Sequence, residues 1–224
     1  MFATVILSIF VFGCRSEAPK PTISLIQAAR DQNVQEVRAN LAWGAPVNEE
    51  EEGFTALDFA LGAENDKPEL RPGWMWNGEF EYSLDAEGKN EEVVLLLLEA
   101  KAKTDEEFSG GLTYLHFAAR EGMLGAVTKL IDSGINVDQP TRSASIRFQG
   151  NRRANGAFLT PLHVAIISSK PEMVRALLSK GADKTVEARY NDYHARNNRG
   201  GGFQNLTVVQ LAIEFCPEVA PELR

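Results

Sequence analysis

Few residues in this chain of 224 amino acids are of types that could do chemistry, and they are widely spaced. The sequence contains three histidines, His116, His163 and His194, and two cysteines, Cys14 and Cys216. A zinc site needs several Cys or His ligands close together, and a nucleophile needs a base that a third group orients. The chain has no closely spaced Cys pair, no glycine-rich loop before Lys-Ser or Lys-Thr, and no Ser-His-Asp grouping in a supporting context. The sequence therefore predicts a protein that is not an enzyme and has no cofactor or metal.

Two of these chemistry-bearing residues have simple structural interpretations. His194 lies in a polar segment beside Tyr190, Asp192 and Tyr193, which favours a place on a loop surface. Cys216 follows an apolar segment, where a lone Cys is typical of a small buried hydrophobic residue.

The other two histidines belong to a seven-residue phrase that occurs five times. The two best copies are Thr160–Ile166 (TPLHVAI) and Thr113–Ala119 (TYLHFAA). Weaker copies begin at Thr55 and Thr207, and the most eroded one begins at Ile23. The phrase resembles the T-P-L-H-x-A signature of ankyrin repeats.

A second landmark keeps the same register, because a glycine closes the second helix of each unit in this family. The same 21 positions separate three pairs of residues: Ile23 and Gly44, Thr113 and Gly134, and Thr160 and Gly181. In the second unit the equivalent of the glycine is Lys101, which lies 46 positions after Thr55. This unit therefore carries an insertion of 25 residues.

Physical chemistry gives each letter of the phrase a role. Thr160 predicts a helix N-cap, and Pro161 suits the first helical position, where an N–H is not needed. Leu162, Ala165 and Ile166 fall on one face of the helix and predict a buried stripe. Gly134 and Gly181 predict helix ends with a positive φ.

The resemblance implies an all-α ankyrin-repeat solenoid of about five helix-turn-helix units with extended finger loops, a finger being the segment that joins one unit to the next. It also implies that His116 and His163 tie neighbouring backbone groups together. The predicted domain spans residues 22–224. We place its units at about 22–52, 53–105, 110–140, 157–188 and 204–224. Pro217 and Pro221 predict that the second helix of the last unit is short or frayed.

The amino-terminal segment predicts a signal peptide over residues 1–13 and a lipidated linker over residues 14–21. Val5–Gly13 has no charged side chain, and Cys14 follows it directly. The arrangement resembles the lipobox of bacterial lipoproteins, which implies a lipid on Cys14 and a place in the bacterial cell envelope. An ordinary cleaved signal and a cytosolic start are the alternatives.

The 25-residue insertion of the second unit is rich in aromatic residues, among them Trp74 and Trp76. One interpretation is that these rings fold back over the outer helices. The other is that they anchor a partner, because Trp and Tyr are common in binding hot spots.

Two further insertions, of 14 residues each, lie in the third and fourth fingers and are basic. Together the two loops carry a charge of +6, so the rest of the chain carries −14 of the total of −8. Charged loops are often merely solvated, but two adjacent basic loops in an acidic protein favour a site for an acidic partner. The predicted site residues are Arg142, Arg147, Arg152, Arg153, Arg189, Arg196 and Arg199.

The predicted function is a non-catalytic protein–protein interaction module on the cell envelope. One alternative is an immunity or inhibitor protein for an envelope toxin or enzyme. The other is an accessory factor for an envelope enzyme, with His194, Cys216 or Met75 as cofactor ligands. We expect a monomer that binds a protein with an acidic surface and contacts the membrane only through its anchor. The net charge of −8 argues against nucleic acid as a partner.

Overall fold

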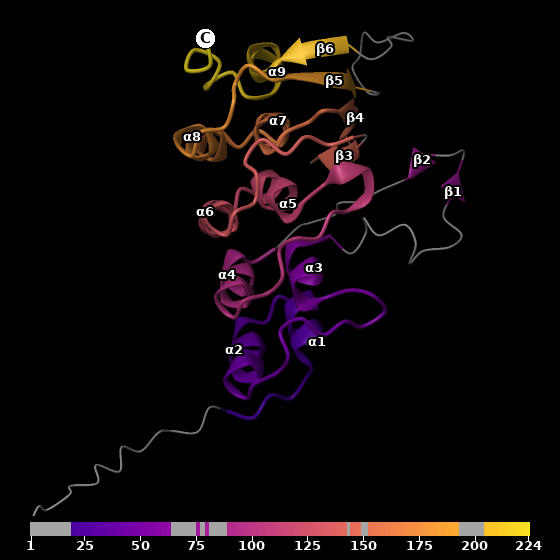
Figure 1. Ribbon diagram of the computed structural model, residues 1–224, viewed down its shortest axis with the longest axis vertical. Coiled ribbons are helices and arrows are strands. Elements are labelled where there is room, and N and C mark those ends of the chain that lie inside the picture. The colour runs from indigo at the N-terminus through magenta and orange to yellow at the C-terminus, as the bar shows by residue number, and fades with distance from the viewer. Residues whose placement is uncertain are drawn as a thin grey trace, which may run out of the picture.

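The protein folds as a stack of helix pairs in which each pair packs on the next. The structure is a computed structural model and describes residues 19–63, 75–76, 79–80, 89–142, 144–148, 152–192 and 204–224. The first helices of the successive units are α1 (Leu25–Arg30), α3 (Ala56–Leu61), α5 (Tyr114–Glu121), α7 (Pro161–Ile167) and α9 (Val208–Phe215). The second helices are α2 (Val34–Ala42), α4 (Glu91–Glu99), α6 (Leu124–Asp132) and α8 (Pro171–Ser179). Figure 1 shows the two groups as parallel columns that run the length of the molecule.

The helices begin where the phrase predicts. Thr55, Thr113, Thr160 and Thr207 are the N-caps of α3, α5, α7 and α9, each in extended backbone. Pro161 occupies the first turn of α7. The second helices of two units have asparagine caps instead: Asn33 accepts from the Glu36 N–H and Asn90 from the Glu92 N–H.

One continuous core runs between the two columns. Leu162, Ala165 and Ile166 of α7 are completely buried, as the spacing of the phrase predicts. Met173 and Leu177 of α8 meet this stripe from the other column. Because no single helix pair encloses its own apolar face, stability comes from contacts between neighbouring units.

The residues that end the second helices share a left-handed backbone. Gly134 has a φ of 100° and Gly181 a φ of 90°, and an added Cβ would meet no atom within 4 Å at either position. Lys101 holds the same place in the second unit with a φ of 68°. Backbone conformation, and not lack of space, therefore favours glycine at these helix ends.

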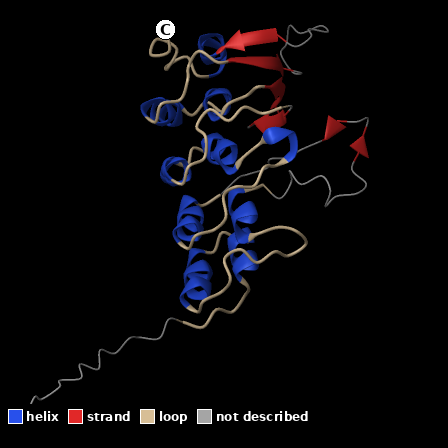
Figure 2. Ribbon diagram, in the orientation of Figure 1, coloured by secondary structure: helices blue, strands red, loops and turns tan. Residues whose placement is uncertain are grey.

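The finger loops pair into a β-sheet, which the prediction of extended loops did not include. Finger three contains β3 (Ala144–Phe148) and β4 (Arg152–Ala157), and finger four contains β5 (Glu187–Asp192) and β6 (Gln204–Thr207). The four strands are antiparallel in the order β3-β4-β5-β6. Figure 2 shows the sheet on the side of the first helices that faces away from the second helices. A separate short hairpin, β1 (Met75–Trp76) and β2 (Glu79–Phe80), lies in the insertion of the second unit.

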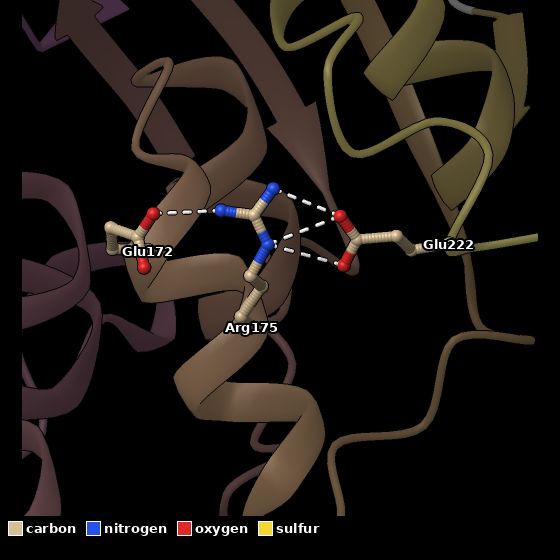
Figure 3. Close-up of polar contacts among 3 residues, drawn as sticks. All are labelled: Glu172, Arg175 and Glu222. Carbon is tan, nitrogen blue, oxygen red and sulfur yellow. Dashed lines mark hydrogen bonds and ion pairs between the residues drawn. The ribbon is translucent and has the colours of Figure 1, made fainter.

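The carboxyl-terminal segment ends the stack with turns, and residues 216–224 contain no helix. It is held against α8 by Arg175, whose guanidinium donates to both carboxylate oxygens of Glu222 over 2.9–3.2 Å and also pairs with Glu172 (Figure 3). Val219 is buried at the end of the core. The prolines therefore replace the last second helix by a compact turn, and do not merely shorten it.

Candidate protein-binding surface

The two basic insertions meet in one sheet. Strand β4 of finger three pairs with strand β5 of finger four, with Ala157 opposite Arg189 and Ala154 opposite Asp192. The third and fourth fingers, which are separated by α7 and α8 in the sequence, therefore form one continuous surface. We call the surface formed by strands β3–β6 and Arg142 the finger sheet.

The predicted arginines are distributed over this sheet as follows. Arg147 in β3 and Arg153 in β4 are direct cross-strand partners, and Arg152 lies opposite Phe148. Arg189 is exposed in β5, beside Ala157 on one side and Asn205 on the other. Arg196 and Arg199 lie outside the described residues.

Arg142 lies just before β3 and joins the sheet to the preceding finger. Its backbone N–H donates over 2.7 Å to the carbonyl of Gly110, which lies in the 3-10 helix η2 (Ser109–Gly111). Its guanidinium forms an ion pair with Glu107, and 74% of the Arg142 side chain is exposed. Such an exposed pair is weak, so an incoming carboxylate can compete for Arg142 at small cost.

The row of fingers changes charge along the stack. The first finger carries Glu49, Glu50, Glu51 and Glu52, all exposed, and the basic strands lie two fingers further on. The structure says less about the tryptophans in the 25-residue insertion of the second unit. Trp76 lies in β1 opposite Glu79, and Trp74 lies outside the described residues.

The motif histidines link the units and are not available as ligands. The Nδ1 of His116 accepts the Thr113 N–H over 3.1 Å, so the proton of the neutral ring is on Nε2. Nε2 then donates to the Leu159 carbonyl of the next finger over 3.1 Å. His163 repeats this arrangement with the Thr160 N–H at 3.0 Å and the Val186 carbonyl at 3.1 Å. Burial lowers the pKa of each ring to about 4, so both are neutral at pH 7.

The second unit uses a different link at the same place. Asp58 replaces the histidine, and one of its carboxylate oxygens accepts the Thr55 N–H over 2.7 Å. The other accepts the hydroxyl of Tyr114 over 2.9 Å. Burial, together with the nearby Asp58 and Glu106 carboxylates, raises the pKa of Tyr114 well above its usual range. Tyr114 occupies the position that Pro161 has in the next unit. The tyrosine in the third copy of the phrase therefore provides the donor for the aspartate that replaces histidine in the second copy.

Of the three residues named as cofactor ligands of an accessory factor, Cys216 is the one whose side chain the structure describes. Cys216 is buried, and burial raises the pKa of its thiol to about 11, so it remains protonated. Met75 lies in β1, and His194 lies outside the described residues. Within the described ranges, no three His, Cys, Asp or Glu side chains gather closely enough to hold a metal ion.

One buried charge escaped prediction. Arg120 in α5 is only 6% exposed, and its Nε donates to Glu121 over 2.6 Å. Neither terminal nitrogen of the guanidinium has a hydrogen-bond partner in the described part of the chain. The guanidinium lies 5.5 Å from the centre of the Phe117 ring, which offers a cation–π contact.

No helix among the described residues is long and apolar enough to cross a membrane.

Comparison with known proteins agrees with the stacked helix pairs. Residues 86–188 match the family model described as "Ankyrin repeats (3 copies)". A segment of 117 residues, 52% of this chain, is 29% identical to the "Putative ankyrin repeat protein FPV240" of Fowlpox virus (strain NVSL). The matched segment covers a quarter of the length of that relative. The ankyrin repeats and the column of helix pairs therefore confirm the predicted fold class: the chain folds as an all-α ankyrin-repeat solenoid, and ankyrin repeats suggest a protein–protein interaction module.

Proposed function

We propose that the chain binds, without catalysis, a protein that has an acidic surface, and that the finger sheet and the adjoining first helices form the binding face. The observation that carries this proposal is the pairing of β4 with β5, which joins two basic insertions into one surface. Without this pairing the arginines would belong to two independent loops. Ankyrin repeats are generally non-catalytic, which supports a role in binding.

The charge pattern supports an acidic partner. Like charges directly opposite one another destabilise a pair of strands, and Arg147 and Arg153 have this relationship. A carboxylate from a partner would offset this repulsion. Arginine also suits the role because its planar fork can bond a carboxylate through two N–H groups at once. Acidic residues elsewhere, such as Glu49 and Glu50, would repel the same partner and so favour one orientation on the stack.

The binding face is tested by charge reversal. Native partners are captured with the full chain as bait and identified, and their association rates are measured at several salt concentrations. The double variant Arg152→Glu/Arg153→Glu should associate several-fold more slowly at low salt, because electrostatic steering is lost. The difference should shrink with salt, since screening acts over about 10 Å at 0.1 M.

A matched control keeps the change in charge and moves its location. Lys129 in α6 and Lys180, the C-cap of α8, are partly exposed and pair with Glu99 and Asp132 in the column of second helices. Lys129→Glu/Lys180→Glu should leave association nearly unchanged. Equal slowing by both double variants would mean that net charge alone matters. Binding that withstands the arginine changes but is lost on replacement of Trp74 and Trp76 would move the site to the 25-residue insertion of the second unit.

We further propose that the module is a monomer held at a bacterial cell envelope by a lipid on Cys14. The support is the uncharged Val5–Gly13 segment directly before that cysteine, which lies outside the described residues. The wild-type protein should partition into detergent, and Cys14→Ser should remain unprocessed or in the aqueous phase. Mass spectrometry that finds Met1 intact on the native protein would refute the anchor.

A further inference from the structure

Phe158, between β4 and α7, has an unfavourable backbone conformation for its residue type. Its φ is 61°, in the left-handed region. A bulky side chain there is a genuine outlier, and such strain is often associated with function.

Earlier units have glycine at the equivalent position. The residue two places before the capping threonine is Gly53 in the second unit and Gly111 in the third, with φ values of 78° and 84°. In the fourth unit the same place, two residues before Thr160, is held by Phe158. The conformation is thus a feature of the repeat, and the aromatic ring is particular to this finger.

Hydrogen bonds to Thr141 impose the conformation. The Phe158 N–H donates to the Thr141 carbonyl over 2.8 Å, and the Leu159 N–H donates to the Thr141 hydroxyl over 3.0 Å. The Thr141 N–H donates in turn to the Leu159 carbonyl over 3.0 Å. Two residues therefore oppose one, as in a β-bulge whose first residue is usually glycine. A glycine at position 158 would satisfy the same bonds without strain.

Burial of the ring does not offset this strain. Phe158 is 51% exposed. The other phenylalanines with described side chains are all buried: Phe54, Phe59, Phe108, Phe117 and Phe215. About half of the surface of Phe158 therefore remains available to another molecule.

Two basic residues neighbour Phe158 through the backbone pairing of the sheet. Arg142 follows Thr141, the residue hydrogen-bonded to Phe158, and its side chain is 74% exposed. Arg189 is exposed and lies opposite Ala157, the residue before Phe158. An exposed apolar ring at the edge of a basic sheet suits a ligand that carries an apolar side chain close to carboxylates.

We propose that Phe158 is the apolar anchor of the finger sheet, and that its ligand is a protein segment in which an aromatic or aliphatic side chain is flanked by acidic residues. This inference rests on the proposed function and adds the chemistry of the partner. Arginine contacts alone would accept any acidic chain. The anchor would select acidic chains that also carry an apolar side chain.

Two synthetic polymers separate these contributions. Binding of the full chain to poly-Glu and to a Glu-Tyr copolymer of equal length is measured, together with the melting temperature of each variant. The wild type should bind the copolymer several-fold more tightly than poly-Glu. Phe158→Gly should bind both polymers equally and melt at the same or a higher temperature, because strain is relieved. A ring that served only to pack on its own chain would instead lower the melting temperature when removed.

Leu124→Ala is the matched control, since Leu124 is 41% exposed at the start of α6, in the other column. It should keep the preference for the copolymer. Equal binding of the two polymers by the wild type, or a preference that survives in Phe158→Gly, would overturn the anchor but leave the acidic-partner proposal intact. Binding of neither polymer by the wild type would overturn the proposed acidic partner, and with it the anchor.

Discussion

The hydroxyl of Tyr114 donates to the carboxylate of Asp58 over 2.9 Å, and this bond joins α5 to α3. Both residues are buried, with 1% and 0% of their surface exposed. In the next two units a histidine forms the equivalent link by donating to a carbonyl. The direction of the bond is therefore reversed in the second unit: Asp58 accepts from the following unit, whereas His116 and His163 donate.

Tyr114→Phe should destabilise the fold by about 1–3 kcal/mol, because it removes a buried hydrogen bond to the Asp58 carboxylate. The cost should fall in an Asp58→Asn background, because a hydrogen bond to a neutral amide is weaker than one to a carboxylate, and a double-mutant cycle by urea unfolding measures this coupling. Glu106→Gln is the control, since Glu106 contacts the same hydroxyl at 3.2 Å but is only partly buried. Additive effects of the changes at Asp58 and Tyr114 would show that the bond does not contribute to stability.

Most of the solenoid could be predicted because its signals are local. Thr160, Pro161 and His163 act within a single turn of helix, and Gly181 acts at a helix end. The finger sheet could not be predicted in the same way. Strand β4 reads RRANGA, which lacks apolar alternation, and one of its two partners, β5, is distant in sequence.

Long-range packing also hid other features. Gly156 has little room for a side chain, because an added Cβ would lie 2.7 Å from the Leu159 side chain and 3.0 Å from the Arg189 carbonyl of the neighbouring strand. The burial of Arg120 was likewise missed, since a charged residue at the end of a helix usually predicts exposure. The unusual residue at position 158 did carry a signal: comparison with Gly53 and Gly111 at the same place in the phrase would have identified it.

Arg120→Met should leave stability unchanged or raise it, because an apolar side chain of similar length avoids burying a charge whose terminal nitrogens lack partners in the described residues. Glu121→Gln should have the opposite effect, since it removes the carboxylate of the ion pair between Arg120 and Glu121. Thermal unfolding of both variants tests this asymmetry. A large loss of stability in Arg120→Met would mean that the cation–π contact with Phe117 dominates.

Leu162→Ala and Leu115→Ala should each lower stability by about 2–5 kcal/mol, because both side chains are completely buried and leave cavities between units. Thr160→Ala should cost about 1 kcal/mol through loss of the helix cap. Leu124→Ala, at a position 41% exposed, should stay within about 0.5 kcal/mol of the wild type in the same urea titration. Wild-type midpoints for both buried variants would show that the repeat register is wrong.

Mild acid should destabilise the solenoid through His116 and His163. In the fold each ring has a pKa of about 4, below the ordinary value of 6.5, because burial disfavours the charged form. Protonation therefore favours the unfolded chain. The contribution to stability is complete above pH 6.5 and is lost as the pH falls towards 4. At about 1.4 kcal/mol per pH unit, each ring should cost about 2 kcal/mol at pH 5.

The chain supplies its own control for this effect. Gln210 holds the histidine position in the last unit, and its side-chain oxygen accepts the Thr207 N–H over 2.8 Å without a titratable group. His163→Gln should retain the cap of α7 but lose the bond to the Val186 carbonyl, so its stability at pH 7 should be lower. Its loss of stability between pH 6.5 and pH 5 should be about half that of the wild type, measured by urea unfolding at each pH. An unchanged pH dependence would mean that the carboxylates, and not the inter-unit histidines, set the acid sensitivity of the stack.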